Sequence, residues 1–321
     1  MNETAWPSVA DVYRAQRRLA GVARRTPLER ADWLSERADV EVHLKLECWQ
    51  RTGSFKLRGA YNAVVARAAE WQGRGLVTAS AGNHGQAVAL AARDAGGRAT
   101  VFVPAGSAEA KVSRIRALGA ELRTVEGTYD DAQEAARCFA RETGAVFVHA
   151  YADPLVVAGQ GTVALELLEQ LPDVRTVVVP VGGGGLIGGI GIVLRAADPA
   201  IRILGAQSRN SSAMHDAFAA GRVVPPPVGP TLADGLAGGV EPESFALVRR
   251  VAESIHVVEE DALPRAIGTL FRNTGIVAEG SGVAGIAALE SGVLPPLDGP
   301  VVIVVTGGNI DAHVLASILA G

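Results

Sequence analysis

The feature that most constrains the fold is an alternation along the chain. Short runs rich in β-branched residues alternate with alanine- and leucine-rich stretches whose apolar residues recur at helical spacing. This order predicts an α/β protein with parallel-rich open sheets flanked by helices, in which functional residues gather in the loops after the carboxyl ends of strands. The runs that predict strands are 41–48, 75–80, 98–104, 121–127, 145–150, 175–182, 202–207, 255–260 and 300–308. The main stretches that predict helices are 57–70, 84–95, 109–118, 130–142, 159–170, 186–197, 243–253, 261–272 and 282–291.

Composition excludes several classes of protein. With 321 residues, 48% of them apolar, the chain is long enough for two lobes with sizeable cores. Its net charge of −4 and the lack of a basic stripe argue against a nucleic-acid partner. No apolar run is long enough for a membrane span or a signal peptide, and only Cys48 and Cys138 are present, so we expect a cytoplasmic protein without disulfides.

Lysine is rare in this chain, which makes each lysine informative. Only Lys45, Lys56 and Lys111 accompany 27 arginines. Lys56 follows a strand and a polar turn, begins a predicted helix, and is flanked by Phe55 and Leu57. Apolar surroundings lower the pKa of an ammonium group and turn it into a nucleophile toward an aldehyde, although a surface lysine is the alternative interpretation.

Two glycine-containing loops follow predicted strands. In TASAGNHGQAVALAA (78–92), the helix start offers backbone N–H groups to an anion such as a carboxylate; the alternative is a tight turn capped by Asn83. In VVVPVGGGGLIGGIG (177–191), four consecutive glycines enter a helix. This segment matches neither a P-loop nor a dinucleotide fingerprint, so a single phosphate group is the better prediction, with close helix packing as the alternative.

A fourth segment, VVIVVTGGN (301–309), is a predicted buried strand that ends in Thr306, whose hydroxyl could donate to a ring nitrogen. The alternative is a threonine that simply closes a strand. Together, the segments offer an amine nucleophile, an anion nest and a phosphate cradle. Pyridoxal phosphate, bound as a Schiff base to Lys56, uses all three.

The chain resembles the serine/threonine dehydratase family, whose fold is that of the tryptophan synthase β subunit group (fold type II). Five motifs carry the resemblance in the family's order: TGSFKLRGAYNA, SAGNHGQAVA, GQGTVALEL, PVGGGGLIGG and TGGN. The resemblance implies a two-lobed enzyme, with residues 1–72 and 150–321 as the large cofactor-binding domain. Residues 73–149 would form a small mobile domain that closes over the substrate.

The resemblance also implies a role for each matching residue. Lys56 would hold the cofactor and move the Cα proton, Phe55 and Gly235 would pack on the two faces of the cofactor ring, and Asn83 would bind the ring hydroxyl. Thr306 would face the pyridine nitrogen. The phosphate would bind Gly182, Gly183, Gly184, Gly185 and Leu186, and the substrate carboxylate would bind Ser80, Ala81, Gly82, Asn83 and His84.

The activity that the resemblance implies is β-elimination of a small hydroxy amino acid to a 2-oxo acid and ammonia, as in threonine or serine dehydratases. The alternatives are a threo-3-hydroxyaspartate ammonia-lyase, another β-substituted amino acid lyase or a racemase of the same fold, and, in another class, a non-catalytic ligand sensor. A sensor would not need Lys56. Tyr151 and Arg209 are candidate residues of the substrate pocket, with a solvated loop residue as the alternative for each, and an inward Arg209 would favour hydroxyaspartate.

Departures from the family refine this prediction. Serine racemases carry a serine where this chain has Ala81, so racemisation should be slow. Relatives with a divalent-cation site have carboxylates where this chain has Gln207 and Ala213, so no metal is expected there; a weak site formed by backbone carbonyls is the alternative. The chain ends at Gly321, soon after the TGGN motif, so isoleucine feedback through a C-terminal sensing domain is not expected. A homodimer or higher homo-oligomer is the default assembly.

Overall fold

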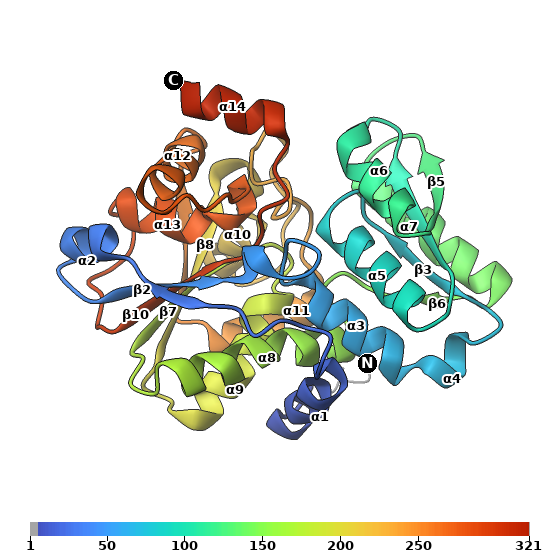
Figure 1. Cartoon of the computed structure of the whole chain (residues 1–321), viewed down its shortest axis with the longest axis horizontal. Helices are drawn as coiled ribbons and strands as arrows, with labels where there is room; N and C mark the ends of the chain where they lie inside the picture. Colours follow the sequence, from blue (N-terminus) through green and yellow to red (C-terminus); the bar gives the residue numbers. More distant parts are fainter. Residues whose placement is uncertain (1–5, 321) are drawn as a thin grey trace.

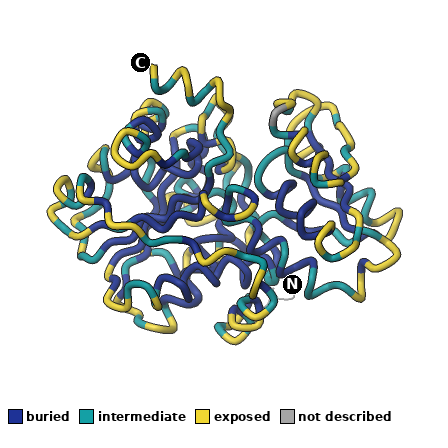
Figure 2. The backbone as a smooth tube through the Cα atoms, viewed as in Figure 1, coloured by how far each residue is buried: buried dark blue, intermediate teal, exposed yellow. Residues whose placement is uncertain are grey.

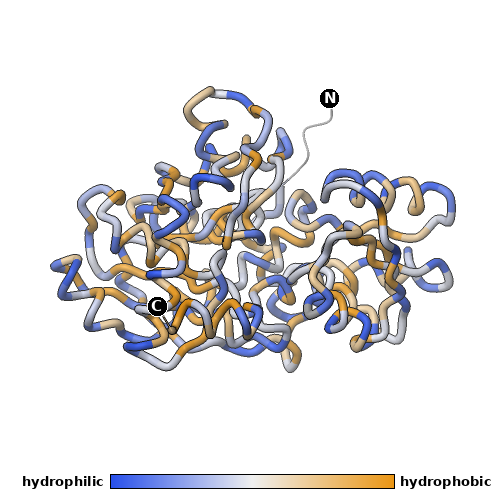
Figure 3. The backbone as a smooth tube through the Cα atoms, turned by 90° about the horizontal axis from the view of Figure 1, so that it is seen from above, coloured by the Kyte–Doolittle hydropathy of each residue, from blue (hydrophilic) through white to orange (hydrophobic). Residues whose placement is uncertain are grey.

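The chain forms two bodies, each built on its own sheet (Figure 1). The structure is a computed structural model that describes residues 6–320. Residues 1–5 and Gly321 lie outside the described residues. Residues 1–5 begin both the predicted large domain and the segment that we expect not to be a signal peptide, and Gly321 ends the predicted large domain. Seen from above, the two bodies stand side by side, with hydrophilic residues on many of the outer loops (Figure 3).

The larger sheet has six strands, in the order β1 (Leu28–Arg30), β2 (Val42–Leu46), β10 (Val301–Val305), β7 (Thr176–Pro180), β8 (Arg202–Ser208) and β9 (Ser254–Val258). Only the β1–β2 pair is antiparallel. The smaller sheet has four parallel strands, in the order β5 (Glu121–Val125), β4 (Ala99–Pro104), β3 (Leu76–Ala79) and β6 (Val146–Phe147). The predicted α/β fold with parallel-rich sheets is confirmed.

Helices surround both sheets, and buried backbone fills the centre of each body (Figure 2). The helices of the larger body are α1 (Val9–Leu19), α2 (Asp32–Ala38), α3 (Lys56–Ala66), α8 (Pro154–Gln170), α9 (Gly185–Ala197), α10 (Ala213–Ala220), α11 (Pro242–Val251), α12 (Ala262–Thr274), α13 (Ala284–Glu290) and α14 (Ala312–Ala320). The short α4 (Ala68–Trp71) follows α3, and the smaller body contains α5 (Asn83–Asp94), α6 (Glu109–Ala117) and α7 (Tyr129–Thr143). Three single-turn helices complete the described chain: η1 (Glu47–Trp49), η2 (Arg209–Ser211) and η3 (Gly280–Gly282).

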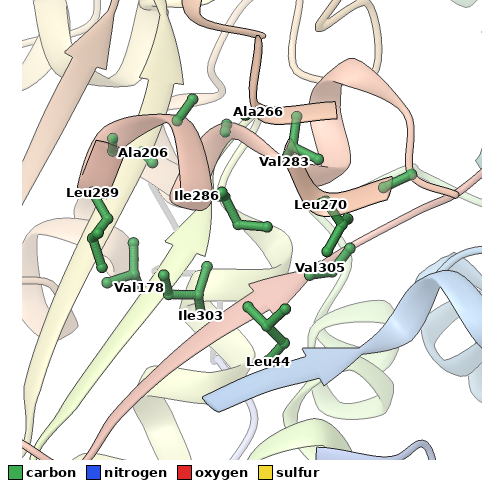
Figure 4. Packing of buried hydrophobic residues seen from close by; sticks show 14 of the residues in the cluster. Leu44, Val178, Ala206, Ala266, Leu270, Val283, Ile286, Leu289, Ile303 and Val305 are labelled. Carbon is green, nitrogen blue, oxygen red and sulfur yellow. The ribbon is translucent and has the colours of Figure 1, made fainter. Parts of the chain in front are cut away.

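The central strands are buried on both faces because alternate residues point to opposite sides of the sheet. In β10, Ile303 and Val305 pack under α12 and α13 (Figure 4), whereas Val302 and Val304 pack toward α8 and α9. A strand with two buried faces reads as the continuous apolar run VVIVV, which is why the sequence predicted it directly.

All nine predicted strands are present, as β2 to β10, but several element boundaries differ from the prediction. Helix α8 begins at Pro154, five residues early, because the Asp153 side chain accepts a hydrogen bond from Leu155 N and proline fits the first turn. The predicted helix 57–70 is broken at Arg67 into α3 and α4. Strand β1 and helix α2 were not predicted, since three and seven residues are too few to show a period. The PPPVGP segment (225–230) is a surface loop.

A cluster of four buried charges, Lys45, Glu47, Arg58 and Glu166, ties α3 to β2 and α8. The Arg58 guanidinium donates to both oxygens of Glu47 at 2.8 Å and to Glu166 at 2.6 Å. The Lys45 ammonium donates to Glu166 at 2.6 Å. Two cations thus face two carboxylates, so this buried ion cluster is neutral and fixes the helix that begins at Lys56.

Candidate active site

A cavity of about 320 Å³ lies at the carboxyl ends of the parallel strands, where the sheet topology predicts a binding site. The segments that follow β3, β7 and β10 contribute Ser80, Gly182 and Thr306 to its wall. Every residue to which the family motifs assigned a cofactor or substrate role lines this one cavity: Phe55, Lys56, Ser80, Ala81, Gly82, Asn83, His84, Gly182, Gly183, Gly184, Gly185, Leu186, Gly235 and Thr306.

Lys56 is the first residue of α3, and its amine points into the cavity. Backbone contacts with the loop after β10 hold this helix start in place: Phe55 N donates to Thr306 O at 3.1 Å, and Gly308 N donates to Gly53 O at 2.9 Å. Burial lowers the pKa of the Lys56 amine to about 8, partly offset by the nearby carboxyl of Glu279. The amine donates to Ala150 O at 3.1 Å. A substantial neutral fraction near physiological pH is what a nucleophilic lysine requires.

The four glycines form a loop that presses against its neighbours. Gly184 has φ of +92°, in the left-handed region that favours glycine, and it caps α9. A Cβ added to Gly183 would lie 2.5 Å from atoms of the Tyr151 ring, and one added to Gly184 would lie 2.6 Å from Val248. Because the first N–H groups of a helix have no partner within it, the start of α9 offers this part of the cavity a set of donors suited to a phosphate dianion.

The second helix start at the cavity is that of α5, capped by Gly82. His84 is buried there, and its Nε2 donates to Val148 O at 3.1 Å. Its Nδ1 has no hydrogen-bond partner among the described residues. Burial and the neighbouring Lys56 lower the pKa of His84 to about 3, so the imidazole is neutral at physiological pH. The α5 start therefore attracts a carboxylate through its N–H groups rather than through a histidine charge.

Asn83 is held by two residues that the sequence analysis did not assign. Its Nδ2 donates to Glu279 Oε1 at 2.6 Å, and its Oδ1 accepts from Asn309 Nδ2, also at 2.6 Å. Nδ2 carries a second hydrogen, which the bond to Glu279 does not use. Burial and the charge of Asp234 raise the pKa of Glu279 to about 7. Glu279 lies in none of the five motifs, so no sequence pattern assigned it to the site. Asn309 is the last residue of TGGN and could have been assigned from that motif.

Three further residues shape the cavity wall: Gly235, Thr306 and Tyr151. Gly235 N donates to Ser281 Oγ at 2.9 Å, and a Cβ at Gly235 would also lie 2.9 Å from that oxygen. The Thr306 hydroxyl is buried at the end of β10. Tyr151, a candidate from the sequence, lines the cavity and donates its hydroxyl to Gly239 O at 3.1 Å.

Polar contacts cross the mouth of the cavity from α6. Lys111 forms an ion pair with Asp234, and both line the cavity. Arg114 Nη1 donates to Asn309 Oδ1 at 2.9 Å. The rarity of lysine could have identified Lys111 from the sequence, since Lys56 lines the cavity and Lys45 belongs to the buried ion cluster.

Arg209 does not reach the cavity. Its guanidinium donates to Glu259 at 2.7 Å, and more than half of its side chain is exposed. Arg209 is thus a solvated loop residue, and the condition under which it would favour a β-carboxylate substrate is not met. Gln207 and Ala213, where cation-dependent relatives carry carboxylates, are both buried.

The residues present fit pyridoxal phosphate. The cavity combines a buried amine of lowered pKa, a loop of glycines with no room for side chains and with helix N–H groups behind it, and a neutral hydroxyl at Thr306. An aldehyde, a phosphate and a ring nitrogen are the groups that such donors recognise.

The fold and site define a class: an α/β enzyme with a nucleophilic lysine and a phosphate loop at the carboxyl edge of its larger sheet. The chain belongs to the pyridoxal-phosphate dependent enzyme family, whose model matches residues 19–307. It is 42% identical over 316 residues to an L-threonine ammonia-lyase of Thermotoga maritima, covering 97% of this chain and 78% of that protein. It is 36% identical to a catabolic L-threonine dehydratase of Escherichia coli, covering 95% and 93% of the two chains.

Among solved structures, maize serine racemase superposes with a TM-score of 0.93 at 31% identity, covering 98% of each chain. The predicted family, fold type and cofactor are thereby confirmed. Within residues 6–320, no helix has the length and apolar character that crossing a membrane requires.

Proposed function

We propose that this enzyme is an L-threonine ammonia-lyase that also accepts L-serine. The observation that carries the proposal is the position of the Lys56 amine, which shares one cavity with the glycine loop and the α5 helix start. The names of the relatives that are 42% and 36% identical support threonine as the preferred substrate. Threonine would yield 2-oxobutanoate and ammonia, and serine would yield pyruvate and ammonia.

The residues of this chain divide the task. Lys56 and the loop Gly182–Leu186 would hold the cofactor by its aldehyde and phosphate, with Phe55 and Gly235 beside the ring. Pyridoxal phosphate, when bound, supplies the electron sink that makes Cα of an amino acid acidic. The start of α5, from Ser80 to His84, binds the substrate carboxylate and fixes the direction of the Cα–H bond.

Proton transfer is assigned to the Lys56 Nζ. With a pKa of about 8, roughly a tenth of the free amine is neutral at pH 7, enough to accept the Cα proton without a second base. Thr306 offers the ring nitrogen only a neutral hydroxyl, which does not stabilise a proton there as a carboxylate would. This arrangement favours loss of the β-hydroxyl over transamination.

Two alternatives receive less support from the cavity wall. A racemase needs a proton donor on the face opposite the lysine, and Ala81 offers none. A hydroxyaspartate lyase needs a cation for the second carboxylate, yet no arginine lines the cavity within residues 6–320, and Lys111 is already paired with Asp234.

The proposal includes the division into a large domain (1–72 and 150–321) and a small domain (73–149) that closes on the substrate. The separate four-stranded sheet supports it, since its strands all lie between residues 76 and 147. We also place the enzyme in the cytoplasm as a homodimer or higher homo-oligomer, without nucleic-acid or membrane partners. Light scattering of the purified protein tests the assembly.

The test is keto-acid release from L-threonine, L-serine and threo-3-hydroxyaspartate by protein loaded with pyridoxal phosphate. We expect release from threonine above serine, none from hydroxyaspartate, and a drop of at least about 1,000-fold in Lys56→Ala. Chiral chromatography of the serine reaction measures D-serine in parallel; Ala81→Ser should raise the ratio of racemisation to elimination. Release from hydroxyaspartate alone, or D-serine as the main product, contradicts the proposal.

A further inference from the structure

The side chain of Gln207 lies outside the cavity, yet it is fully buried at the end of β8, and both ends of its amide form hydrogen bonds. Its Nε2 donates to two backbone oxygens, Val181 O at 2.9 Å and Ser211 O at 2.7 Å. Its Oε1 accepts from His215 N at 2.8 Å. The three partners determine which end of the amide is nitrogen, because two of them only accept and one only donates.

These contacts reach the phosphate loop from two directions. Val181 directly precedes Gly182, so the Val181 carbonyl marks the point where β7 ends and the glycine loop begins. His215 lies in the first turn of α10, and its neighbour Met214 packs beneath the loop, where a Cβ on Gly184 would lie 3.0 Å from Met214 Cε. The Gln207 amide thus holds both the entry strand of the loop and the helix underneath it.

Two buried carbonyl oxygens that converge on one point need a positive group between them. A pair of N–H bonds meets this need, and so does a divalent cation, which in proteins gathers carbonyl and carboxylate oxygens. Here the point between the carbonyls is occupied by the hydrogens of an amide, which cannot coordinate a cation. Ala213 offers no ligand, and the nearby Asp216 accepts from Ser212 Oγ at 2.7 Å and pairs with His215 Nδ1 at 3.1 Å.

The donor set therefore does not fit the divalent cation that some members of the family bind at this position. Across residues 6–320, no group of three or more histidine, cysteine or acidic side chains could hold a metal ion. We propose that the Gln207 amide is a built-in substitute for that cation: it positions the glycine loop for the cofactor phosphate, and the enzyme needs no divalent metal to do so. The inference concerns the cofactor loop and does not depend on which amino acid is the substrate.

The first arm of the test uses the wild-type enzyme. Its thermal unfolding midpoint and its affinity for pyridoxal phosphate, followed by protein fluorescence, are measured in EDTA and in about 5 mM CaCl2 or MgCl2, which exceeds the dissociation constant of most calcium sites of this type. We expect midpoints within about 1 °C of one another and affinities within about twofold. A wild-type protein that loses stability or cofactor affinity in EDTA, and regains it with either cation, overturns the proposal.

The second arm converts the donor into an acceptor. In Gln207→Glu, one carboxylate oxygen still accepts from His215 N, while the other faces Val181 O and Ser211 O with no hydrogen between them. In EDTA we expect a midpoint at least about 5 °C below the wild type and cofactor affinity at least about tenfold weaker. Calcium or magnesium should restore more than half of both losses, because the three oxygens then have a cation to bind.

Two controls separate this effect from general ones. Gln133→Glu, on the partly exposed face of α7, tests whether any new carboxylate makes the protein sensitive to cations, and we expect no sensitivity. Gln207→Met keeps the volume but offers neither donor nor acceptor, so its cofactor affinity should fall and stay low with either cation. If Gln207→Met binds the cofactor as tightly as the wild type, the amide does not position the loop. If Gln207→Glu has the wild-type midpoint and cofactor affinity in EDTA, the Gln207 amide does not take the place of a cation. If Gln207→Glu does not fold, the wild-type and methionine measurements still decide the question.

Discussion

Lys56 and Glu279 show how two buried groups of opposite sign set the charge in one cavity. Burial favours the neutral form of each, which lowers the pKa of the amine to about 8 and raises the pKa of the carboxyl to about 7. Their mutual attraction acts against burial on the amine, since the Glu279 charge raises the Lys56 pKa. The protonation of the Lys56 amine therefore depends on Glu279, a residue far from it in the sequence.

This coupling predicts a shift in the reactivity of Lys56. Near pH 8, Glu279 is ionised and stabilises the Lys56 ammonium, so Glu279→Gln should lower the lysine pKa and move the onset of amine reactivity to lower pH. The measurement is pulse acetylation of cofactor-free protein between pH 6 and 11, with peptide mass spectrometry. Only three lysines are present, so the signal from Lys56 is unambiguous.

Glu290→Gln, which removes a half-buried carboxyl on α13, is the matched control and should leave the Lys56 midpoint unchanged. An unchanged or higher midpoint in Glu279→Gln would show that the Glu279 charge does not reach the amine.

Sequence reasoning located Lys56 but not Glu279, and the reason is physical. Lys56 stands in a motif whose neighbours are apolar, and a charged residue among apolar ones is visible in the sequence. Glu279 enters the cavity because β10 and η3 come together in space: Glu279 N donates to Gly307 O at 3.0 Å. Such a contact between distant parts of the chain leaves no local pattern.

At the scale of elements, the glycine loop depends on the absence of side chains. Gly183→Ala places a methyl group 2.5 Å from the Tyr151 ring, so the ring or the loop must shift. We expect the affinity for pyridoxal phosphate to fall by about tenfold or more, since a loop that binds phosphate through N–H groups depends on their position. Fluorescence titration of the cofactor measures the loss.

Gly106→Ala is the control, because nothing lies within 4 Å of a Cβ at that position. Tyr151→Ala removes the ring that the new methyl group would meet. Gly183→Ala should therefore cost less cofactor affinity in the Tyr151→Ala background than in the wild type. Normal cofactor binding by the single Gly183 variant would mean that the loop tolerates the displacement.

The buried ion cluster makes a second prediction at this scale. Glu166→Gln leaves Lys45 and Arg58 facing a single carboxylate, so the free energy of unfolding should fall by about 3 kcal/mol or more. Adding Lys45→Met restores neutrality with Arg58 and Glu47 still paired, and should recover more than half of the loss. Urea unfolding followed by circular dichroism gives both values.

The comparison is Glu121→Gln, which breaks an exposed pair with Arg123 and should cost no more than about 0.5 kcal/mol. If Glu166→Gln costs as little as Glu121→Gln, or if the double variant is less stable than the single one, charge balance does not govern this cluster.

The same cluster shows where prediction of elements reached its limit. Strands and long helices followed from periodicity, and the loops after β7 and β10 followed from glycine runs. The tie between α3, β2 and α8 did not, because Lys45, Arg58 and Glu166 look like ordinary surface charges in an amphipathic pattern. Their burial results from the packing of α8 against β2 and α3, which brings together residues far apart in the chain: Lys45 and Glu166 are 121 positions apart.

For the whole molecule, the arrangement of two sheets was predicted from the family resemblance rather than from the alternation of elements, which does not say where one sheet ends. The two bodies meet at the mouth of the cavity through α6, whose Lys111 pairs with Asp234 of the larger body and whose Arg114 contacts Asn309. Both contacts are partly exposed, so water and salt weaken them. The two bodies also pack together through a buried apolar cluster between α3 and α5, so these two contacts are the exposed part of the junction.

This geometry predicts a separation of kinetic effects. Lys111→Met removes a contact across the mouth without touching Lys56 or the glycine loop, so closure over bound substrate should be less favourable. We expect KM for L-threonine to rise about three- to tenfold while kcat changes less than about twofold. Hydrogen exchange should also accelerate in residues 73–149 of the substrate-bound enzyme.

Arg116→Met is the matched control, because Arg116 lies on the same helix and pairs with Glu109 of α6 rather than with the larger body. Salt should raise the wild-type KM toward that of Lys111→Met and change the variant less, since the ion pair is already gone. If Lys111→Met and Arg116→Met behave alike, the pair does not contribute to closure. If kcat falls while exchange in residues 73–149 stays as slow as in the wild type, Lys111 acts on the chemistry itself rather than on the meeting of the two bodies.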